Sequence, residues 1–511
     1  MTASVPADHP PRSPEASLTC LVTGATGYIG GRLVPELLAE GHRVRVMTRS
    51  PERLRDHPWA RSVEVVRADA ANTEQVTAAC AGADVVYYLI HALASGPSFE
   101  ATDRRTAEIM ARAAREAGVG RLVYLGGLEP EAEELSPHLR SRGEVADILL
   151  ASGVPTVVLR AAIVLGSGSA SFEMLRYLTE RLPVMVTPRW VHSRIQPIAI
   201  RDVLRYLVGC ARLPSAVHRS FDIGGPDVMN YADMMQRYAA VAALPRRRIL
   251  PVPFFTPSLS SHWVGLVTPV PASIARPLVE SLRNTVVCRE HDIAEYVPDP
   301  PEGLLGFDEA VRLAVQRVKD SAVATRWSSA SVPGAPSDPL PTDPAWAGGS
   351  LYVDERTRPT TAPPDALWRV VEGIGGETGW YSFPLAWEAR GLLDRMVGGV
   401  GLRRGRRDRH DLYVGDALDF WRVEELDEGR LLRLRAEMRL PGLAWLEFHV
   451  EHDADRTAGT VLRQRATFAP RGLFGHLYWW SVAPFHGIVF GSMLRNITRA
   501  AEGAAEVRAA A

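Results

Sequence analysis

A glycine-rich turn near the start of the chain constrains the fold more than any other feature. Residues 23–30 read TGATGYIG; they follow a short apolar run at residues 18–22 and precede leucines at helical spacing. Gly24 allows a tight turn, Gly27 lets the backbone approach a pyrophosphate, and Gly30 lets helix and strand pack closely. An ordinary strand-to-helix turn is the alternative. Three glycines at this spacing, between these elements, favour a dinucleotide site at the helix start.

The strand that follows bears on the choice between NADP and NAD. Residues 43–47 alternate as a strand, and Arg49 comes just after them, with Arg53 one turn on and no carboxylate before Glu52. A fold that prefers NAD usually places an acid here to bond the ribose 2′-hydroxyl. Arginine instead suits a 2′-phosphate by its charge and fork geometry. We therefore predict NADP as the cofactor, with NAD as the alternative; a merely solvated Arg49 is the other interpretation.

Further cofactor contacts are expected beyond the strands, because ligands bind at the carboxyl ends of parallel strands. Asp69 suits either a bond to the adenine amino group or a cap on the helix that begins near Asn72. The contacts predicted from the residues alone are Gly24, Ala25, Thr26, Gly27, Tyr28, Ile29, Gly30, Arg49, Asp69, Ala70, Leu89, Ile90 and His91.

Strands and helices alternate through the rest of the first half of the chain. This alternation predicts an α/β fold with a doubly wound, parallel Rossmann sheet. The further strands expected are residues 63–67, 84–89, 121–125 and 156–160, and the longer helices are residues 99–117 and 137–151.

Composition limits the classes of protein to which the chain can belong. A length of 511 residues predicts two or more domains. An apolar fraction of 46% and a net charge of −1 exclude nucleic-acid binding through a large basic excess. The four cysteines form no CxxC pair, so neither a metal site nor a disulfide framework is expected, and a reducing cytoplasm fits.

We expect neither a signal peptide at residues 1–17 nor a transmembrane helix. Residues 1–17 are rich in Pro, Ser and Ala, lack the apolar core of a signal peptide, and are expected to be a disordered tail. The chain contains no run of about 18 apolar residues, so no transmembrane helix is expected. Peripheral membrane contact stays open, because residues 398–410 carry five arginines that suit a phosphate, a membrane surface or simply a solvated loop.

Several motifs together resemble an atypical short-chain dehydrogenase/reductase, nearest to the extended and NmrA-like branches. They are the TGATGYIG turn, the strand–helix order, the YYLIHAL strand end and the YLGGL strand, with later landmarks in RAAIVLG, IQPI and FDIGG. The similarity covers about residues 18 to 320. It implies an NAD(P)-binding Rossmann domain at residues 18–325, with a substrate region from about residue 167.

The catalytic residues of this superfamily are replaced here. The superfamily uses Ser or Thr after the fifth strand and a Tyr-xxx-Lys pair on the next helix, but this chain has Gly126 or Gly127, then His138 and Arg142. The resemblance implies that Arg142 keeps the cofactor ribose contact. His138 is a candidate acid/base because an unperturbed histidine titrates near neutrality; a solvated or capping histidine is the alternative. The ordinary Ser-Tyr-Lys route is not supported.

A second domain is expected after a linker at residues 326–348, which is rich in Ser, Pro and Asp. Residues 349–506 resemble the START/polyketide-cyclase (SRPBCC) superfamily, an α+β helix-grip fold in which a curved sheet wraps a long helix around an apolar cavity. The whole arrangement is similar to a bacterial family with an atypical reductase fused to a C-terminal domain of undefined function. The elements expected are strands at 350–356, 418–425, 431–437, 444–451 and 460–469, and helices at 362–373, 385–397 and 472–504.

Three functional hypotheses follow. The first is a cytoplasmic NAD(P)(H)-binding oxidoreductase or isomerase for a hydrophobic small molecule, which the second domain holds or covers. The second is a catalytically silent redox sensor of the NmrA-like kind, favoured by the missing catalytic set. The third is a carrier or assembly factor for a lipid or quinone, in which the second domain is the active part.

Overall fold

The computed structural model describes residues 17–510 apart from several internal segments. The ranges left out are 1–16, 56, 92–98, 131–135, 253–267, 282–283, 324–349, 383–411, 453–458 and 511. The predicted tail (save residue 17), the linker at 326–348, the helix at 385–397 and the arginine-rich stretch at 398–410 therefore lie outside the described residues. The chain forms two compact units, Met1–Gly349 and Ser350–Ala511.

A seven-stranded parallel sheet organises the first unit, in the order β11-β6-β5-β4-β1-β2-β3. This confirms the predicted parallel Rossmann sheet, to which β11 adds a strand at one edge. The strands are β1 (Thr19–Thr23), β2 (Arg43–Thr48), β3 (Glu64–Arg67), β4 (Val85–Tyr88), β5 (Arg121–Gly127), β6 (Thr156–Ala161) and β11 (Arg219–Ile223).

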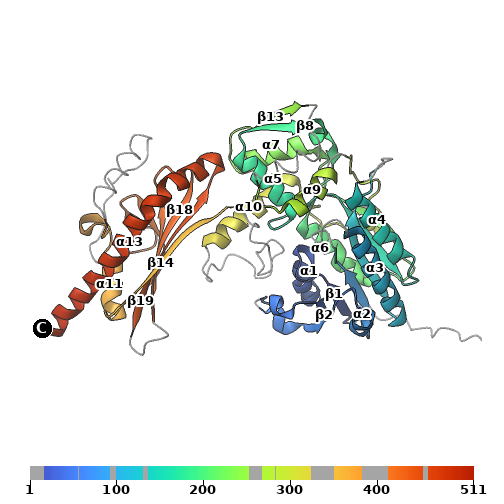
Figure 1. Cartoon of the computed structure of the whole chain (residues 1–511), viewed down its shortest axis with the longest axis horizontal. Coiled ribbons are helices and arrows are strands. Elements are labelled where there is room, and N and C mark those ends of the chain that lie inside the picture. The colour runs from blue at the N-terminus through green and yellow to red at the C-terminus, as the bar shows by residue number, and fades with distance from the viewer. Residues whose placement is uncertain are drawn as a thin grey trace, which may run out of the picture. The chain divides into compact units, whose positions relative to one another are not determined.

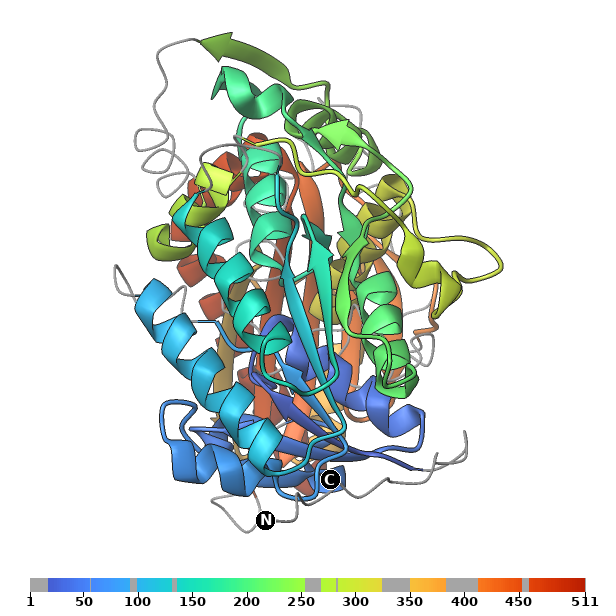
Figure 2. The ribbon, with the colours of Figure 1, turned by 90° about the vertical axis from the view of Figure 1, so that its right-hand side faces the viewer.

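Helices cover both faces of this sheet (Figures 1 and 2). Val22 and Tyr87 belong to the core on one face, whereas their chain neighbours Leu21 and Val86 belong to the core on the other. All four are fully buried, which is why the central strands read as continuous apolar runs. One face carries α1 (Tyr28–Ala39) and α6 (Ile200–Gly209), and the other carries α2 (Thr73–Cys80), α3 (Phe99–Glu116) and α4 (Pro137–Leu150).

A third apolar core lies in the residues that follow β6, the predicted substrate region. Helices supply most of it, and three two-stranded pairs, β7 with β10, β9 with β12 and β8 with β13, complete it. The elements are β7 (Val164–Leu165), α5 (Ala170–Arg181), β8 (Val184–Pro188), β9 (Arg194–Ile195), β10 (Ile198–Ala199), β12 (Met229–Asn230), α7 (Tyr231–Val241), β13 (Arg248–Val252), α9 (Ala272–Ser281) and α10 (Phe307–Val323). Short 3-10 helices of this unit are η1 (Pro51–Leu54), η2 (Ala60–Ser62), η4 (Arg189–His192), η5 (Cys210–Arg212) and η6 (Asp292–Glu295).

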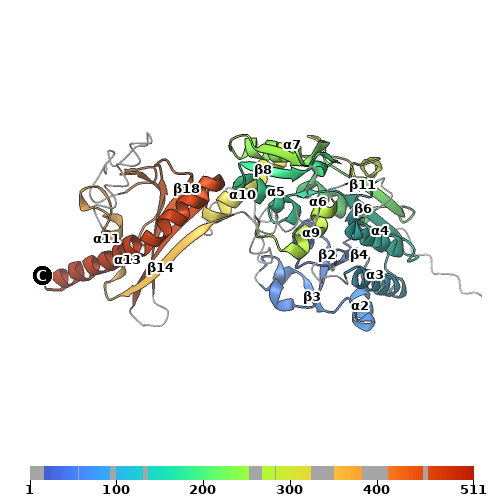
Figure 3. The ribbon, with the colours of Figure 1, turned by 45° about the horizontal axis from the view of Figure 1, so that its top comes forward.

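The second unit is built on an antiparallel sheet of six strands in the order β14-β19-β18-β17-β16-β15. Helix α13 lies along this sheet beside β14 (Figures 1 and 3). Leu446 and Phe448 of the sheet share one core with Met493 and Ile497 of α13. The elements are β14 (Tyr352–Thr360), α11 (Pro364–Glu372), η7 (Gly376–Thr378), β15 (Ala417–Leu418), β16 (Trp421–Asp427), β17 (Leu431–Ala436), β18 (Gly442–His452), β19 (Thr460–Pro470) and α13 (Gly472–Ala510).

One predicted strand of this unit is wrong. The stretch expected as a single strand at residues 418–425 is split between β15 and β16. Asp419 has a positive φ of 55°, so the chain turns there. Its carboxylate accepts hydrogen bonds from the Trp380 indole at 2.8 Å and the Gly376 N–H at 3.2 Å, which hold the turn in place. Among the described helices of both units, none is long and apolar enough to cross a membrane.

Candidate functional site

The glycine turn has the geometry that its sequence predicts. Gly24 takes a φ of +72°, and the Gly27 N–H donates to the Gly24 carbonyl at 2.9 Å. A Cβ on Gly24 would lie 2.6 Å from the Leu89 carbonyl oxygen, and one on Gly30 would lie 2.4 Å from the Gly24 carbonyl oxygen. Both contacts are with backbone atoms that cannot move aside. The turn therefore requires glycine at both positions.

The start of α1 is open to an anion. Gly27 is the N-cap residue of the helix, no side chain caps the first turn, and this turn contains no acidic residue. The first N–H groups of a helix have no partner within it, and the helix dipole adds positive charge there. These two properties together make the turn a fitting place for the phosphates of a dinucleotide.

A cavity of about 430 Å³ begins at this turn and passes the carboxyl ends of β4, β5 and β6. Its size is typical of small-molecule and cofactor sites. The residues that line it are Gly24, Thr26, Gly27, Tyr28, Ile29, Gly30, Arg53, Leu89, Ile90, His91, Tyr124, Leu125, Gly126, Gly127, Leu128, His138, Leu139, Arg142, Ala161, Ala162, Ile163, Val164, Gly168, Ser169, Ala170, Ser171, Met174, Tyr231, Ile274, Leu278 and Val286.

Most of the predicted cofactor contacts meet at this cavity. Those brought to its wall are Gly24, Thr26, Gly27, Tyr28, Ile29, Gly30, Leu89, Ile90, His91 and Arg142. Ala25 is instead buried in the core, and Ala70 lies outside the lining. Arg49 is exposed at the end of β2 and is also absent from the lining, whereas Arg53 of η1 is part of it.

Asp69 does not cap the helix that follows β3. Asn72 is the N-cap of α2, and its side chain accepts the Gln75 N–H at 3.1 Å. The Asp69 carboxylate accepts the Ala71 N–H at 3.0 Å, and its side chain is exposed outside the cavity lining. Of the two predicted roles, the capping role is wrong, and the adenine contact stays a prediction.

His138 and Arg142 both reach the cavity from α4. Ser136 caps this helix by accepting the Leu139 N–H, so the capping alternative for His138 is also wrong. Burial, and then the positive charge of Arg142 and the His91 ring, lower the pKa of His138 to about 3. The imidazole is therefore neutral near pH 7.

Tyr124 of β5 is the residue that sequence reasoning missed. It is 2% exposed and lines the cavity. Burial raises the pKa of its phenol, and the positive charge of Arg142, followed by a hydrogen bond from it, opposes that rise only in part. Arg142 also donates to the Leu125 carbonyl at 3.0 Å, which holds the guanidinium at the end of β5.

Gly126 lies close to the Tyr124 ring. A Cβ on Gly126 would lie 3.2 Å from the Tyr124 ring. Residues two apart on a strand share a face, so the YLG pattern places this ring beside residue 126. A tyrosine two positions before a glycine was thus the signal that could have revealed it.

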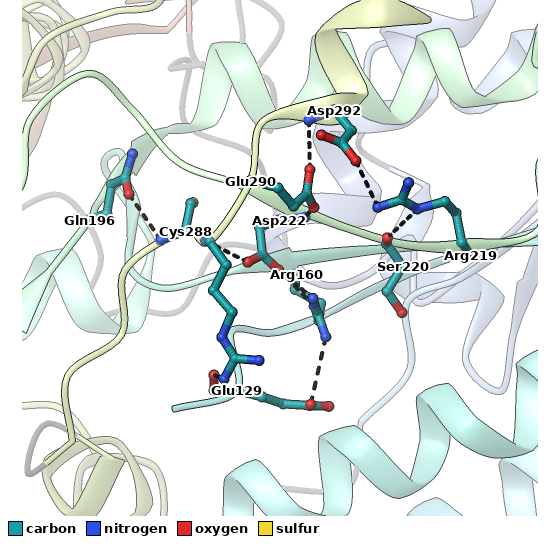
Figure 4. Close-up of polar contacts among 10 residues, drawn as sticks. Glu129, Arg160, Gln196, Arg219, Ser220, Asp222, Cys288, Glu290 and Asp292 are labelled. Atoms are coloured by element: carbon teal, nitrogen blue, oxygen red, sulfur yellow. Dashed lines mark hydrogen bonds and ion pairs between the residues drawn. The ribbon is translucent and has the colours of Figure 1, made fainter. Parts of the chain in front are cut away.

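An ion cluster links the ends of β6 and β11 to the segment at residues 289–290 (Figure 4). Arg160 donates to the Asp222 carboxylate at 2.8 and 2.7 Å, and Asp222 is almost fully buried. The other Asp222 oxygen accepts the Arg289 N–H at 3.0 Å, while Glu290 accepts the Asp222 N–H at 2.5 Å. These bonds tie the segment just after Val286, a cavity-lining residue, to the end of the sheet.

Comparison with known families distinguishes the two units. Residues 24–171 match a family model described as NAD(P)H-binding, and this range runs from the glycine turn through β6 to the first residues of α5. The N-terminal unit is an NAD(P)-binding Rossmann domain. It resembles the atypical short-chain dehydrogenases/reductases, with Gly126 and Gly127 at the end of β5. Residues 346–493 match a family described as protein of unknown function (DUF2867).

Individual relatives and solved structures match part of this chain. NADH dehydrogenase (ubiquinone) 1 alpha subcomplex subunit 9, mitochondrial, of Arabidopsis thaliana is 24% identical over 280 residues, 53% of this chain and 69% of that protein. Ceramide reductase of Caulobacter vibrioides is 29% identical over 199 residues, 38% of this chain and 61% of that one. The solved structure of Citrobacter sp. triphenylmethane reductase with NADP(H) is 19% identical and covers 58% of this chain and 99% of its own, with a TM-score of 0.48.

Proposed function

We propose that the protein is an NADP(H)-dependent reductase that acts on a hydrophobic small molecule. The observation that carries the proposal is that one cavity joins the phosphate-binding turn to the Tyr124–Arg142 pair and to an apolar wall. A dinucleotide site alone would fit many roles. A proton-holding group and an apolar wall in the same cavity fit a reaction on a second molecule.

The apolar wall lies in the part of the cavity formed after β5. Apolar side chains from several elements supply it, among them Leu128, Ile163, Met174, Ile274 and Leu278. Such a wall favours a ligand with an apolar body by removing apolar surface from water. The relative named ceramide reductase supports a lipophilic substrate class.

The chemistry rests on Tyr124 and Arg142 in place of the Tyr-Lys pair. When bound, NADPH supplies a hydride. Tyr124 holds a proton at Oη, as an unionised phenol does near neutral pH. The positive charge of Arg142 stabilises the phenolate that remains once that proton moves to a developing oxyanion. His138, with a pKa of about 3, is neutral and has no such proton to donate.

The preference for NADP rests on arginines after β2. Arg53 lines the cavity and Arg49 stands exposed four residues earlier. A guanidinium matches a 2′-phosphate in charge and in geometry, so we assign Arg53 the main contact and Arg49 a supporting one.

We further propose that the second unit is a domain that binds a lipophilic ligand. Its antiparallel sheet packs against the long helix α13, as expected of a helix-grip fold. Its order of strand, helix, antiparallel strands and long C-terminal helix also agrees with the START-like prediction. In this proposal the unit holds or covers the substrate of the Rossmann domain.

The test is oxidation of NADPH by the full-length protein in the presence of hydrophobic ketones, enones and quinones. Turnover of at least one of these acceptors, with NADPH preferred over NADH, is the expected result. The reaction without acceptor is the control. Tight NADPH binding with no turnover across the panel would overturn the proposal.

A second candidate function is a dinucleotide sensor without catalysis. The position of the superfamily's catalytic hydroxyl falls on Gly126 or Gly127, and His138 is neutral. A sensor must distinguish the two redox states of the cofactor. Calorimetric titration with NADP⁺ and with NADPH tests this, because a sensor binds one form much more tightly, while equal affinities speak against it.

A further inference from the structure

The long helix α13 differs between its two halves. In the second half, apolar residues point into the core of the C-terminal unit, where they contact the sheet and α11. These buried residues are Phe490, Met493, Leu494, Ile497 and Ala501, none more than 8% exposed. This half has the ordinary arrangement of a helix that packs on a sheet.

In the first half, several large apolar residues instead face outward. Phe474 is 74% exposed, and Trp480 and Phe485 are each 62% exposed. With 3.6 residues per turn, these side chains and their apolar neighbours fall within an arc of about 140° on one side of the helix. We name this surface the α13 stripe; it consists of Leu473, Phe474, Leu477, Trp480, Phe485 and Ile488.

The opposite side of this half is anchored to the sheet. The Tyr352 hydroxyl and the His476 Nδ1 lie 2.8 Å apart, and the Tyr352 ring stacks on Trp479 with ring centres 5.0 Å apart. Further along, His486 Nδ1 lies 3.5 Å from the Asp354 carboxylate. These contacts fix the rotation of the helix about its own axis. The stripe is therefore held outward by packing and is not the result of a frayed helix end.

The distribution of charged residues along α13 also distinguishes the stretch that carries the stripe. Residues 472–494 contain no Asp, Glu, Lys or Arg. Exposed arginines stand at both ends of this stretch, Arg471 on one side and Arg495 and Arg499 on the other. An exposed aromatic and aliphatic face with cationic flanks has the chemistry of a helix that lies in a membrane interface.

We propose that the α13 stripe binds the surface of an anionic lipid bilayer, with the helix lying in the plane of the interface. Soluble proteins rarely expose several large apolar side chains side by side unless that surface has a partner. Aromatic rings favour the boundary between headgroups and acyl chains, and arginines favour anionic headgroups. A second copy of this chain would bury the same side chains but would bring the arginines of two copies near one another, so charge favours the bilayer.

The proposal is independent of catalysis by the Rossmann domain. It concerns side chains of the second unit alone, and it needs neither cofactor nor turnover. If both proposals hold, the second unit would meet its lipophilic ligand at the surface from which that ligand comes.

The test is flotation of the full-length protein with vesicles of phosphatidylcholine alone and of phosphatidylcholine mixed with phosphatidylglycerol. The parent protein should float with the mixed vesicles. The combined change Phe474→Ser, Trp480→Ser and Phe485→Ser should weaken binding by roughly a thousand-fold, because each buried aromatic side chain contributes about ten-fold. The matched control is Tyr413→Ser with Val414→Ser, which removes exposed apolar side chains of the same unit outside the stripe; it should bind like the parent.

A charge-reversal variant, Arg471→Glu with Arg495→Glu, should lose the preference for the mixed vesicles. Circular dichroism and thermal unfolding of each variant show that the fold is retained. A folded parent protein that floats with neither vesicle overturns the proposal. A dimer in sedimentation that the triple-serine variant abolishes, without vesicle binding by the parent, also overturns it and assigns the stripe to a second copy.

Discussion

The two ends of the cavity are built in different ways. The glycine turn consists of backbone atoms from residues adjacent in sequence, and its shape follows from three glycines. The corner of β5 and α4 consists of side chains from separate elements: Tyr124, His138 and Arg142. Binding of a dinucleotide can thus be read from a local motif, whereas the chemistry depends on which side chains the fold brings together.

The strongest test of the turn is Gly30→Ala. The added Cβ would lie 2.4 Å from the Gly24 carbonyl oxygen and 2.9 Å from the Ala25 Cα, both backbone atoms. We expect a loss of about 1–3 kcal/mol in the free energy of unfolding and a loss of NADPH affinity of roughly a hundred-fold or more. Urea unfolding and calorimetric titration measure the two effects.

The matched control for this change is Gly503→Ala on α13, where a Cβ meets no atom within 4 Å. It should leave NADPH affinity unchanged and stabilise the helix slightly. If Gly30→Ala bound NADPH as tightly as this control, the turn would not be the phosphate site.

The strongest test of the corner is Tyr124→Phe, which removes only the phenolic oxygen. Since a positioned general acid contributes roughly a hundred-fold or more to a rate, kcat should fall by about that factor with any acceptor that the parent reduces. The dissociation constant for NADPH should change little, because the phosphate turn is untouched. A fall in affinity without a fall in kcat would show that Tyr124 serves cofactor binding.

The contrast between the glycine turn and the corner of β5 and α4 also explains which features could be predicted from the sequence. The parallel sheet and the turn follow from residues in continuous runs, such as the strand ending at Thr23 and the glycines after it. The role of His138 was assigned by its position in a superfamily pattern. Its burial, with Arg142 one turn along the same helix and His91 from the segment after β4, lowers its pKa to about 3, and no linear pattern contains that information.

In the second unit, too, sequence patterns did not contain the features that depend on distant residues. Most of its strands could be located from alternating residues. The break at Asp419 could not, because it depends on hydrogen bonds from Trp380 and Gly376, about forty residues earlier in the chain. The outward stripe on α13 was likewise hidden, since the sequence does not show which face of a mostly apolar helix contacts the sheet.

A smaller loss of NADPH affinity is expected for changes at the two arginines after β2, and it should differ between them. Arg53→Ala should weaken NADPH binding by roughly ten-fold and leave NADH binding almost unchanged, since a charge-assisted bond to the 2′-phosphate is lost. Arg49→Ala, its matched control, should have a clearly smaller effect because Arg49 lies outside the cavity lining. Calorimetric titration with both cofactors measures the difference. Equal losses for NADPH and NADH in Arg53→Ala would remove the basis for an NADP preference.

The smallest effect on activity is expected for His138→Gln, with kcat within about three-fold of the parent. Stability should respond to pH. The folded pKa of about 3 lies below the ordinary value of 6.5, so between these values the unfolded chain binds more protons at this site. The free energy of unfolding of the parent therefore falls as pH drops below about 6.5, and the variant loses less of it. Urea unfolding of both proteins near pH 7 and pH 5 measures this difference. Parallel pH profiles of the free energy of unfolding would contradict the lowered pKa of His138. A loss of kcat as large as that of Tyr124→Phe would return the catalytic role to His138.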